Sequence, residues 1–154
     1  DNVSGEIFSL VNWQNSRFGY YFHTTAYETA DIMREYYGYK RVEVLENPTH
    51  EQISSNILAG RPVIAPLAGR LLKNPYYSGE GPVFHMLVIK GITERGDYIT
   101  NDVGTRRGGN FIYKKEILMN ALHDVKTGGD TWWGNNPAID ILSGSKRVIV
   151  VYPN

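Results

Sequence analysis

The stretch FHMLVIKGITERGDYITNDVGTRRGG, from Phe84 to Gly109, decides the fold because it predicts a β-hairpin. Its first part is a nearly continuous apolar run, which is typical of a strand buried on both faces. Residues 93–96 are polar and contain a glycine, as expected of a hairpin connection of about four or five residues. The β-branched and aromatic residues at 98–100 then supply the return strand.

This hairpin predicts that a histidine and an aspartate lie close together. We expect Ile92 to pair with Asp97 across the loop, a register that puts Asp102 opposite Leu87. Because side chains alternate between the two faces of a strand, Leu87 shares a face with His85. Asp102 is then the diagonal neighbour of His85, about 7–8 Å away at the backbone. A register shift of one residue would move the two side chains to opposite faces.

Two interpretations of this pair remain open on spacing alone. A carboxylate beside an imidazole fixes its tautomer and orientation, and the imidazole can then take a proton from a thiol or hydroxyl, as in a nucleophilic triad. The alternative is a strand histidine that a nearby acid satisfies without any catalytic role.

Composition narrows the classes of function. A chain of 154 residues has the size of one domain, which we expect to cover residues 1–154. Sixteen basic and sixteen acidic residues cancel, so no field of one sign favours nucleic acid or an anionic membrane. No apolar run approaches the ~20 residues that a membrane span needs.

The chain contains no cysteine, which excludes disulfides, thiolate metal sites and any thiol nucleophile of its own. The histidines are scattered without the spacing of metal ligands, so we expect no metal and no cofactor; they are His23, His50, His85 and His123.

Two capping-box sequences predict helix starts. Thr25 to Glu28 begins a helix that ends at Gly38, and Thr49 to Gln52 begins one that ends at Gly60. The remaining predicted elements are a helix over 6–13, strands over 41–44, 61–67 and 146–153, and a helix over 114–124. Helices that precede most of the strands indicate the α+β class, with helices packed on an antiparallel sheet.

Three loops could contribute to a site. Residues 68–82 form a long loop rich in glycine, proline and tyrosine that could line a cleft beside His85. Arg106 and Arg107 stand between glycines without the spacing of a phosphate-binding motif. An anion site is one interpretation of them, and an arginine that holds loop backbone or pairs with a carboxylate is the more ordinary one. Trp132 and Trp133 could form the lip of a groove or a hydrophobic plug.

Several runs together resemble peptidase family C-39, within the papain-like cysteine peptidases. They are HMLVIKG, YITND, GTRRGGNFIYKKEILMNALHD, TTAYETADIMREYYGY and ENPTHEQISSNILAGRPVI. That family includes the bacteriocin-processing, double-glycine peptidases and many secreted bacterial domains. The resemblance spans nearly the whole chain and implies a papain-like fold that hydrolyses peptide bonds with a Cys-His-Asp triad. It also implies a peptide or protein substrate, and an extracellular or cell-envelope location rather than a cytoplasmic one.

By this resemblance His85 is the general base and Asp102 the residue that orients it. In such proteins a cysteine begins a helix in the N-terminal part, and a glutamine shortly before it contributes to the oxyanion hole. We expect the segment with both residues, including an N-terminal helix, to be missing here, so that the domain is N-terminally incomplete and the chain inactive alone. None of the serines and threonines has the context of a nucleophile elbow.

A missing helix would leave an apolar face of the sheet exposed. The partner that covers such a face would be the missing segment or a second copy of the chain. The alternative function is a non-catalytic domain with a papain-like fold that binds peptide or glycan. Its binding residues would be Tyr76, Tyr77, Trp132 and Trp133.

Overall fold

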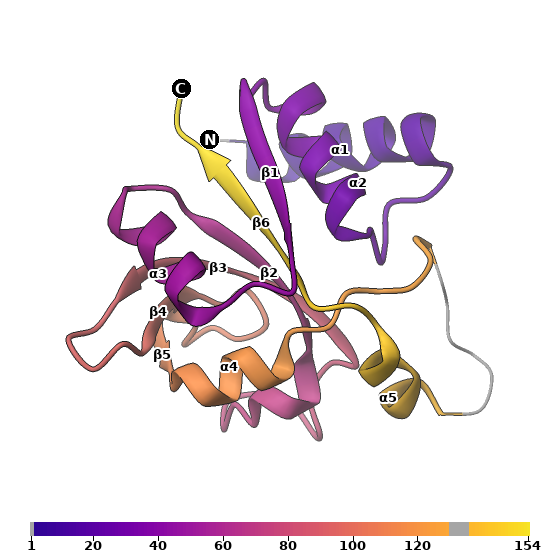
Figure 1. The fold of residues 1–154 in the computed structure, drawn as a ribbon. Coiled ribbons are helices and arrows are strands. Elements are labelled where there is room, and N and C mark those ends of the chain that lie inside the picture. Colours follow the sequence, from indigo (N-terminus) through magenta and orange to yellow (C-terminus); the bar gives the residue numbers. More distant parts are fainter. Residues whose placement is uncertain (1, 130–135) are drawn as a thin grey trace.

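The computed structural model of the chain describes residues 2–129 and 136–154 (Figure 1). The expectation for Trp132 and Trp133 therefore lies outside the described residues. The helices are α1 (Val3–Phe18), α2 (Ala26–Asp31), α3 (His50–Leu58), α4 (Lys115–Ala121) and α5 (Pro137–Asp140), with the π-helix η1 (Ile32–Tyr36) and the 3₁₀ turns η2 (Gly69–Leu72) and η3 (Ile141–Ser143). The strands are β1 (Arg41–Glu46), β2 (Val63–Ala68), β3 (Phe84–Ile92), β4 (Tyr98–Asn101), β5 (Gly109–Tyr113) and β6 (Arg147–Tyr152).

These strands form a six-stranded sheet in the order β1-β6-β2-β3-β4-β5. Every pair of neighbours is antiparallel, so the predicted α+β class is confirmed. The C-terminal strand β6 lies between β1 and β2 and so joins the N-terminal helices to the hairpin half of the sheet (Figure 1).

The predicted register beside the hairpin loop was wrong by one residue. Ile92 pairs with Tyr98 instead of Asp97. Thr93 closes the loop, because its amide donates to the Asp97 carbonyl at 2.9 Å and its hydroxyl accepts from the Asp97 amide at 3.0 Å. The backbone and side chain of Thr93 thus bind both backbone groups of Asp97, and Ile92 pairs with the next residue, Tyr98.

A β-bulge then restores the predicted alignment further along the hairpin. The register shifts between Ile89 and Gly91, and beyond the shift Val88 pairs with Asn101. The residue after Asn101 is Asp102, which therefore arrives at the end of the sheet where the sequence predicted it. One extra residue in one strand has cancelled the error at the loop.

The two faces of the sheet carry separate hydrophobic cores. Along β6, Val148 and Val150 contact the cluster that includes side chains from α3 and α4. Ile149 and Val151 point the other way, into the cluster that contains the alanines of α2. This alternation is expected of a strand that is buried on both faces.

Both predicted capping boxes are confirmed. The Thr25 hydroxyl accepts from the amide of Glu28, whose side chain accepts from the Thr25 amide, and Thr49 and Gln52 do the same. The helix that starts at Thr25 continues as the π-helix η1 before Gly38 ends it with a φ of 76°. The first helix is longer than predicted, and β5 and α5 were not predicted.

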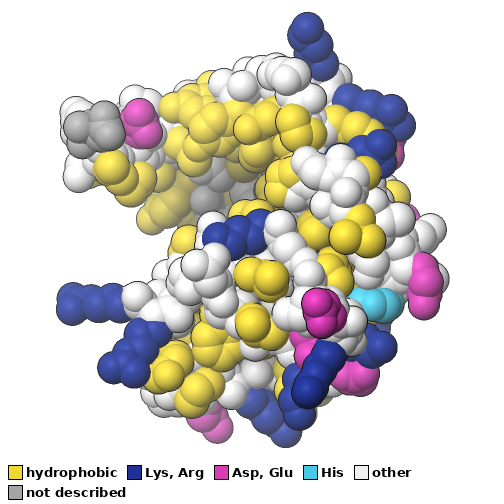
Figure 2. Space-filling view, turned by 90° about the vertical axis from the view of Figure 1, so that its left-hand side faces the viewer, with side chains coloured by type: hydrophobic (Ala, Val, Ile, Leu, Met, Phe, Trp, Pro, Cys, Tyr) yellow, Lys and Arg dark blue, Asp and Glu magenta, His cyan; other side chains and the backbone are white. Residues whose placement is uncertain are grey.

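Exposed apolar side chains gather on α1, where Val3, Ile7 and Phe8 are all exposed. Figure 2 shows a hollow in the molecular surface with apolar side chains above it. The central strands β2 and β6 are buried along nearly their whole length, so these two strands do not show the open apolar face that a missing helix would leave.

None of the helices in the described part of the chain is both long and apolar enough to cross a membrane.

Candidate active site

The structure brings His85 and Asp102 into direct contact. His85 is near the start of β3, and Asp102 follows the last residue of β4. The imidazole Nε2 lies 2.7 Å from the carboxylate Oδ1, and the side chains are 9% and 0% exposed. The predicted neighbourhood of these two residues is confirmed.

Four donors surround the buried carboxylate of Asp102. Its Oδ1 faces His85 Nε2 and also accepts from the Gly104 amide at 2.8 Å. Its Oδ2 accepts from the hydroxyls of Tyr77 and Tyr113, each at 2.6 Å. A charged carboxylate with no solvent contact is stable in a protein only when its oxygens are satisfied in this way.

These contacts keep Asp102 ionised. Burial by itself raises the pKa of the carboxyl group, but the hydrogen bonds from His85 and the two tyrosines, with that from the Gly104 amide, lower it further than burial raises it. The net pKa of Asp102 is well below its usual value of 3.8. Burial and the hydrogen bond to the carboxylate raise the pKa of Tyr113 to about 12, and the same causes raise that of Tyr77. Both hydroxyls therefore stay protonated as donors at neutral pH.

The network assigns the tautomer of the neutral imidazole. An ionised carboxylate only accepts hydrogen bonds, so Nε2 of His85 carries the proton that points at Asp102. Nδ1 then holds the lone pair, and no group in residues 2–129 or 136–154 is found hydrogen-bonded to it. An imidazole oriented this way can accept a proton at Nδ1 while the carboxylate stabilises the resulting charge.

The loop between β4 and β5 packs tightly against the pair. A Cβ on Gly104 would lie 3.0 Å from His85 Cε1 and 2.9 Å from Tyr77 Cε1, so a larger residue there must displace the site. The loop closes on itself through the Asp102 amide, which donates to the Gly108 carbonyl at 2.9 Å. A Cβ on Gly108 would meet the Asp102 carbonyl oxygen at 1.7 Å. Two glycines are thus required by close approach rather than by turn geometry alone.

Sequence reasoning did not identify Tyr113 or Tyr77 as donors to Asp102. Tyr113 ends β5, a strand that was not predicted, and its hydroxyl also accepts from Asn74 Nδ2 at 2.7 Å. Tyr77 was named only as a ligand-binding residue of the alternative, non-catalytic domain; in the structure its hydroxyl donates to Asp102 and its ring packs edge-on against His85, 5.7 Å between centroids. The aromatic and β-branched run Phe111-Ile112-Tyr113 after the glycine pair was the available signal for β5.

Two of the other histidines have hydrogen-bond partners outside this cluster. His50 Nδ1 lies 2.6 Å from the hydroxyl of the buried Tyr98, and His123 Nδ1 lies 2.9 Å from the Gly144 carbonyl. Burial lowers the pKa of His123. Among the described residues, no three or more histidine, cysteine or acidic side chains are grouped to hold a metal ion.

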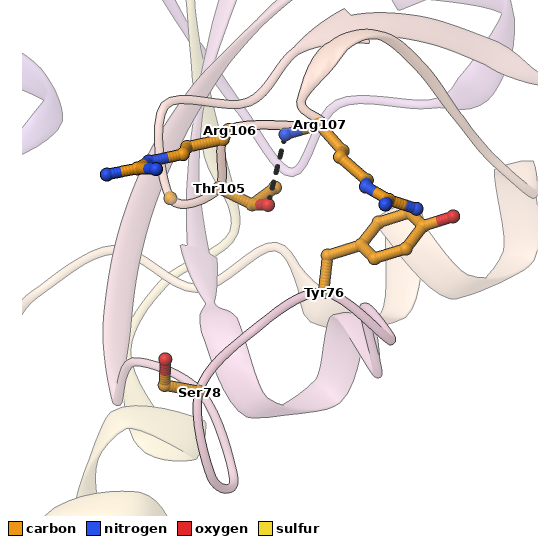
Figure 3. A pocket seen from close by; sticks show the side chains of 6 residues that line it. Tyr76, Ser78, Thr105, Arg106 and Arg107 are labelled. Atoms are coloured by element: carbon orange, nitrogen blue, oxygen red, sulfur yellow. Dashed lines mark hydrogen bonds between the residues drawn. The ribbon is translucent and has the colours of Figure 1, made fainter.

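An open pocket of about 610 Å³ lies beside the pair. Its lining residues come from the two loops that hold Asp102, and they are Tyr76, Ser78, Gly104, Thr105, Arg106 and Arg107 (Figure 3). Gly104 belongs to both the pocket and the Asp102 network. A molecule bound in the pocket would therefore lie close to His85.

A comparison with curated proteins gave no match. Among solved structures the chain is similar to a fragment of Prevotella intermedia prointerpain A that carries a cysteine-to-alanine mutation, with 20% identity, 81% of this chain covered and a TM-score of 0.44. The chain spans 32% of the length of that fragment. Residues 6–125 match the Peptidase_C39 like family, which is more than half of the 154 residues, and the chain therefore belongs to that family.

Proposed function

We propose that this chain carries the base and the orienting residue of a cysteine peptidase. In this proposal His85 is the general base and Asp102 holds its tautomer. The supporting observation is the 2.7 Å contact between Nε2 and a buried carboxylate with four donors, which leaves Nδ1 for a thiol. Family membership supports the same peptidase chemistry.

The reaction is acyl transfer through a covalent intermediate. The thiol proton moves to Nδ1 of His85, and the sulfur forms a bond to the carbonyl carbon of the peptide. The C–N bond then breaks as the imidazolium returns its proton to the leaving amine, and water hydrolyses the thioester with the imidazole as base again. Asp102 remains ionised throughout, because its pKa is held far below neutral pH.

The sequence has no cysteine, so the proposal requires the sulfur to come from a segment outside these 154 residues or from another chain. We expect residues 1–154 alone to be inactive, because the covalent route needs the nucleophile. An extracellular or cell-envelope location is part of the same proposal.

The test compares the polypeptide encoded by the complete reading frame with residues 1–154, using a fluorogenic protein substrate. We expect hydrolysis only by the former, and a loss of about 10²–10⁴-fold in kcat/KM on His85→Gln, the range that general-base catalysis contributes. Inhibition by iodoacetamide should identify the sulfur. Hydrolysis that persists after treatment with iodoacetamide, or a His85→Gln variant of undiminished activity, would rule the cysteine peptidase out.

A second candidate is a non-catalytic domain that binds peptide or glycan. It is favoured by the absence of cysteine together with the open pocket that displays Tyr76 beside two arginines. The two candidates separate in the same experiment, since the binding domain predicts a full polypeptide that binds peptide or glycan without cleaving either.

A further inference from the structure

We propose that the pocket beside His85 binds an acidic segment of a peptide, through carboxylates held by Arg106 and Arg107. The identification of the ligand as a peptide rests on the proposed function, whereas the preference for an anionic ligand does not. The pocket lining contains two guanidinium groups and no acidic residue.

The two guanidinium groups are not neutralised by the described part of the protein. Five other arginines form ion pairs with carboxylates; these are Arg17, Arg34, Arg41, Arg70 and Arg147. Within the same described residues, no ion pair is found for Arg106 or Arg107. The acidic residue of the neighbouring loop, Glu80, already lies 3.1 Å from Arg70. Two uncompensated cations that line one concavity favour an anionic ligand, and guanidinium groups match carboxylates in geometry.

The loop that carries the arginines is held in place before any ligand binds. The Gly108 amide donates to the Thr105 carbonyl at 3.2 Å, and the Arg107 amide donates to Thr105 Oγ1 at 3.2 Å. The Arg107 guanidinium lies 4.9 Å from the ring centroid of Tyr76, a cation–π contact that orients the group. An organised cationic surface loses less entropy when it binds a ligand.

The direction of the two side chains favours an extended ligand. Figure 3 shows Arg107 running down to Tyr76 while Arg106 extends to the other side of the loop. The two cations therefore flank the pocket instead of converging on one point. An extended peptide with acidic side chains a few residues apart suits two cations that point in different directions.

The pocket adjoins the His85 site, and in the proposed peptidase a peptide would occupy both. Gly104 lines the pocket, and its amide donates to Asp102 Oδ1 at 2.8 Å. A peptide that passes His85 would thus place neighbouring side chains over the arginines. In the proposed peptidase this contact selects substrates with acidic residues close to the scissile bond.

The binding test uses the 154-residue chain and two fluorescein-labelled peptides, Gly-Glu-Gly-Glu-Gly-Gly and Gly-Gln-Gly-Gln-Gly-Gly, followed by fluorescence anisotropy at low salt. We expect the glutamate peptide to bind at least tenfold more tightly, and this preference to fall as salt is added. Arg106→Gln and Arg107→Gln should each reduce the preference at least threefold, and the double variant should remove it. The matched control is Arg95→Gln, which removes the same charge from the exposed β3–β4 turn and should change nothing.

Equal affinity for the two peptides, or a preference that survives in the double variant, would overturn the proposal. Displacement of the glutamate peptide by an equal concentration of inorganic phosphate would also overturn it, because it would identify a general anion site. The readout needs no nucleophile, so it stays separate from the test of the peptidase. If the complete polypeptide cleaves protein but this preference is absent, the pocket assignment alone has failed.

Discussion

Removing the hydroxyl of Tyr113 probes the buried carboxylate at the centre of the candidate site. The Tyr113→Phe variant deletes one of two 2.6 Å hydrogen bonds to Asp102 Oδ2 while it keeps the ring in the core. A hydrogen bond to a charged group contributes about 1.5–3 kcal/mol. The same change leaves Asn74 Nδ2 without its acceptor at 2.7 Å, and a buried unpaired donor costs about 1–3 kcal/mol. Because Tyr77 and the Gly104 amide still donate, we expect partial compensation and a total loss of about 2–4 kcal/mol of unfolding free energy.

The assay is urea unfolding at pH 7, followed by far-ultraviolet circular dichroism with linear extrapolation to water. A matched control is Tyr27→Phe, which deletes a hydrogen bond of the same 2.6 Å length to the exposed carboxylate of Glu46. The control should change stability by only a small fraction of the Tyr113 effect, because solvent replaces an exposed hydrogen bond. Equal losses in the two variants, or a Tyr113→Phe loss below about 0.5 kcal/mol with an unchanged m-value, would refute the account of a carboxylate that depends on these donors.

Three further predictions concern Gly104, the pH dependence of the Asp102 contribution, and the helix cap at Thr49. Gly104→Ala should lower stability by about 1–3 kcal/mol, measured as a lower Tm, because its Cβ would crowd the rings of Tyr77 and His85; an unchanged Tm would contradict the close packing. Because the folded pKa of Asp102 is depressed, its contribution to stability is complete above the ordinary value of 3.8 and is lost as pH falls through the folded value. Asp102→Asn should therefore be less stable than wild type in urea at pH 7, with a gap that narrows below about pH 4, whereas a gap that widens on acidification would reverse the sign of the linkage. Thr49→Ala should cost about 1 kcal/mol in the same urea assay because it removes the cap of α3, and a neutral effect would show that the capping box contributes little.

The hairpin and both capping boxes could be predicted because their signals are local. Thr25 and Thr49 precede an acid or amide by three residues, and that spacing alone satisfies the first amides of a helix. To predict that His85 approaches Asp102, only the order of the strands and the correct alternation of side chains between faces were needed. Here the prediction was right although its register at the loop was wrong.

The bulge shows why the register could not be derived with certainty. A strand pattern gives no direct sign of one extra residue, and the two errors cancelled only because the register shifts between Ile89 and Gly91. Gly91 was the available clue, since glycine inside a strand often marks a bulge or a close approach. A Cβ at Gly91 would indeed lie 3.1 Å from Ile99 Cδ1 on the neighbouring strand.

The rest of the site depends on contacts between distant segments. Tyr77 and Tyr113 are 36 residues apart, and both reach the same oxygen of Asp102. Neither has a sequence pattern that distinguishes a donor to a buried carboxylate from an ordinary core tyrosine. The short strand β5 follows a glycine pair and has exposed alternate positions, so its weak pattern also hid Tyr113.

The central claim is that Asp102 holds His85 with a proton on Nε2 and a lone pair on Nδ1. The most direct measurement is a ¹H–¹⁵N spectrum of the imidazole nitrogens in the folded chain at a pH where His85 is neutral. We predict the Nε2–H tautomer, with a strongly deshielded proton that identifies the hydrogen bond to the carboxylate. An Nδ1–H tautomer, or the averaged signals of an imidazole that reorients freely, would contradict the account.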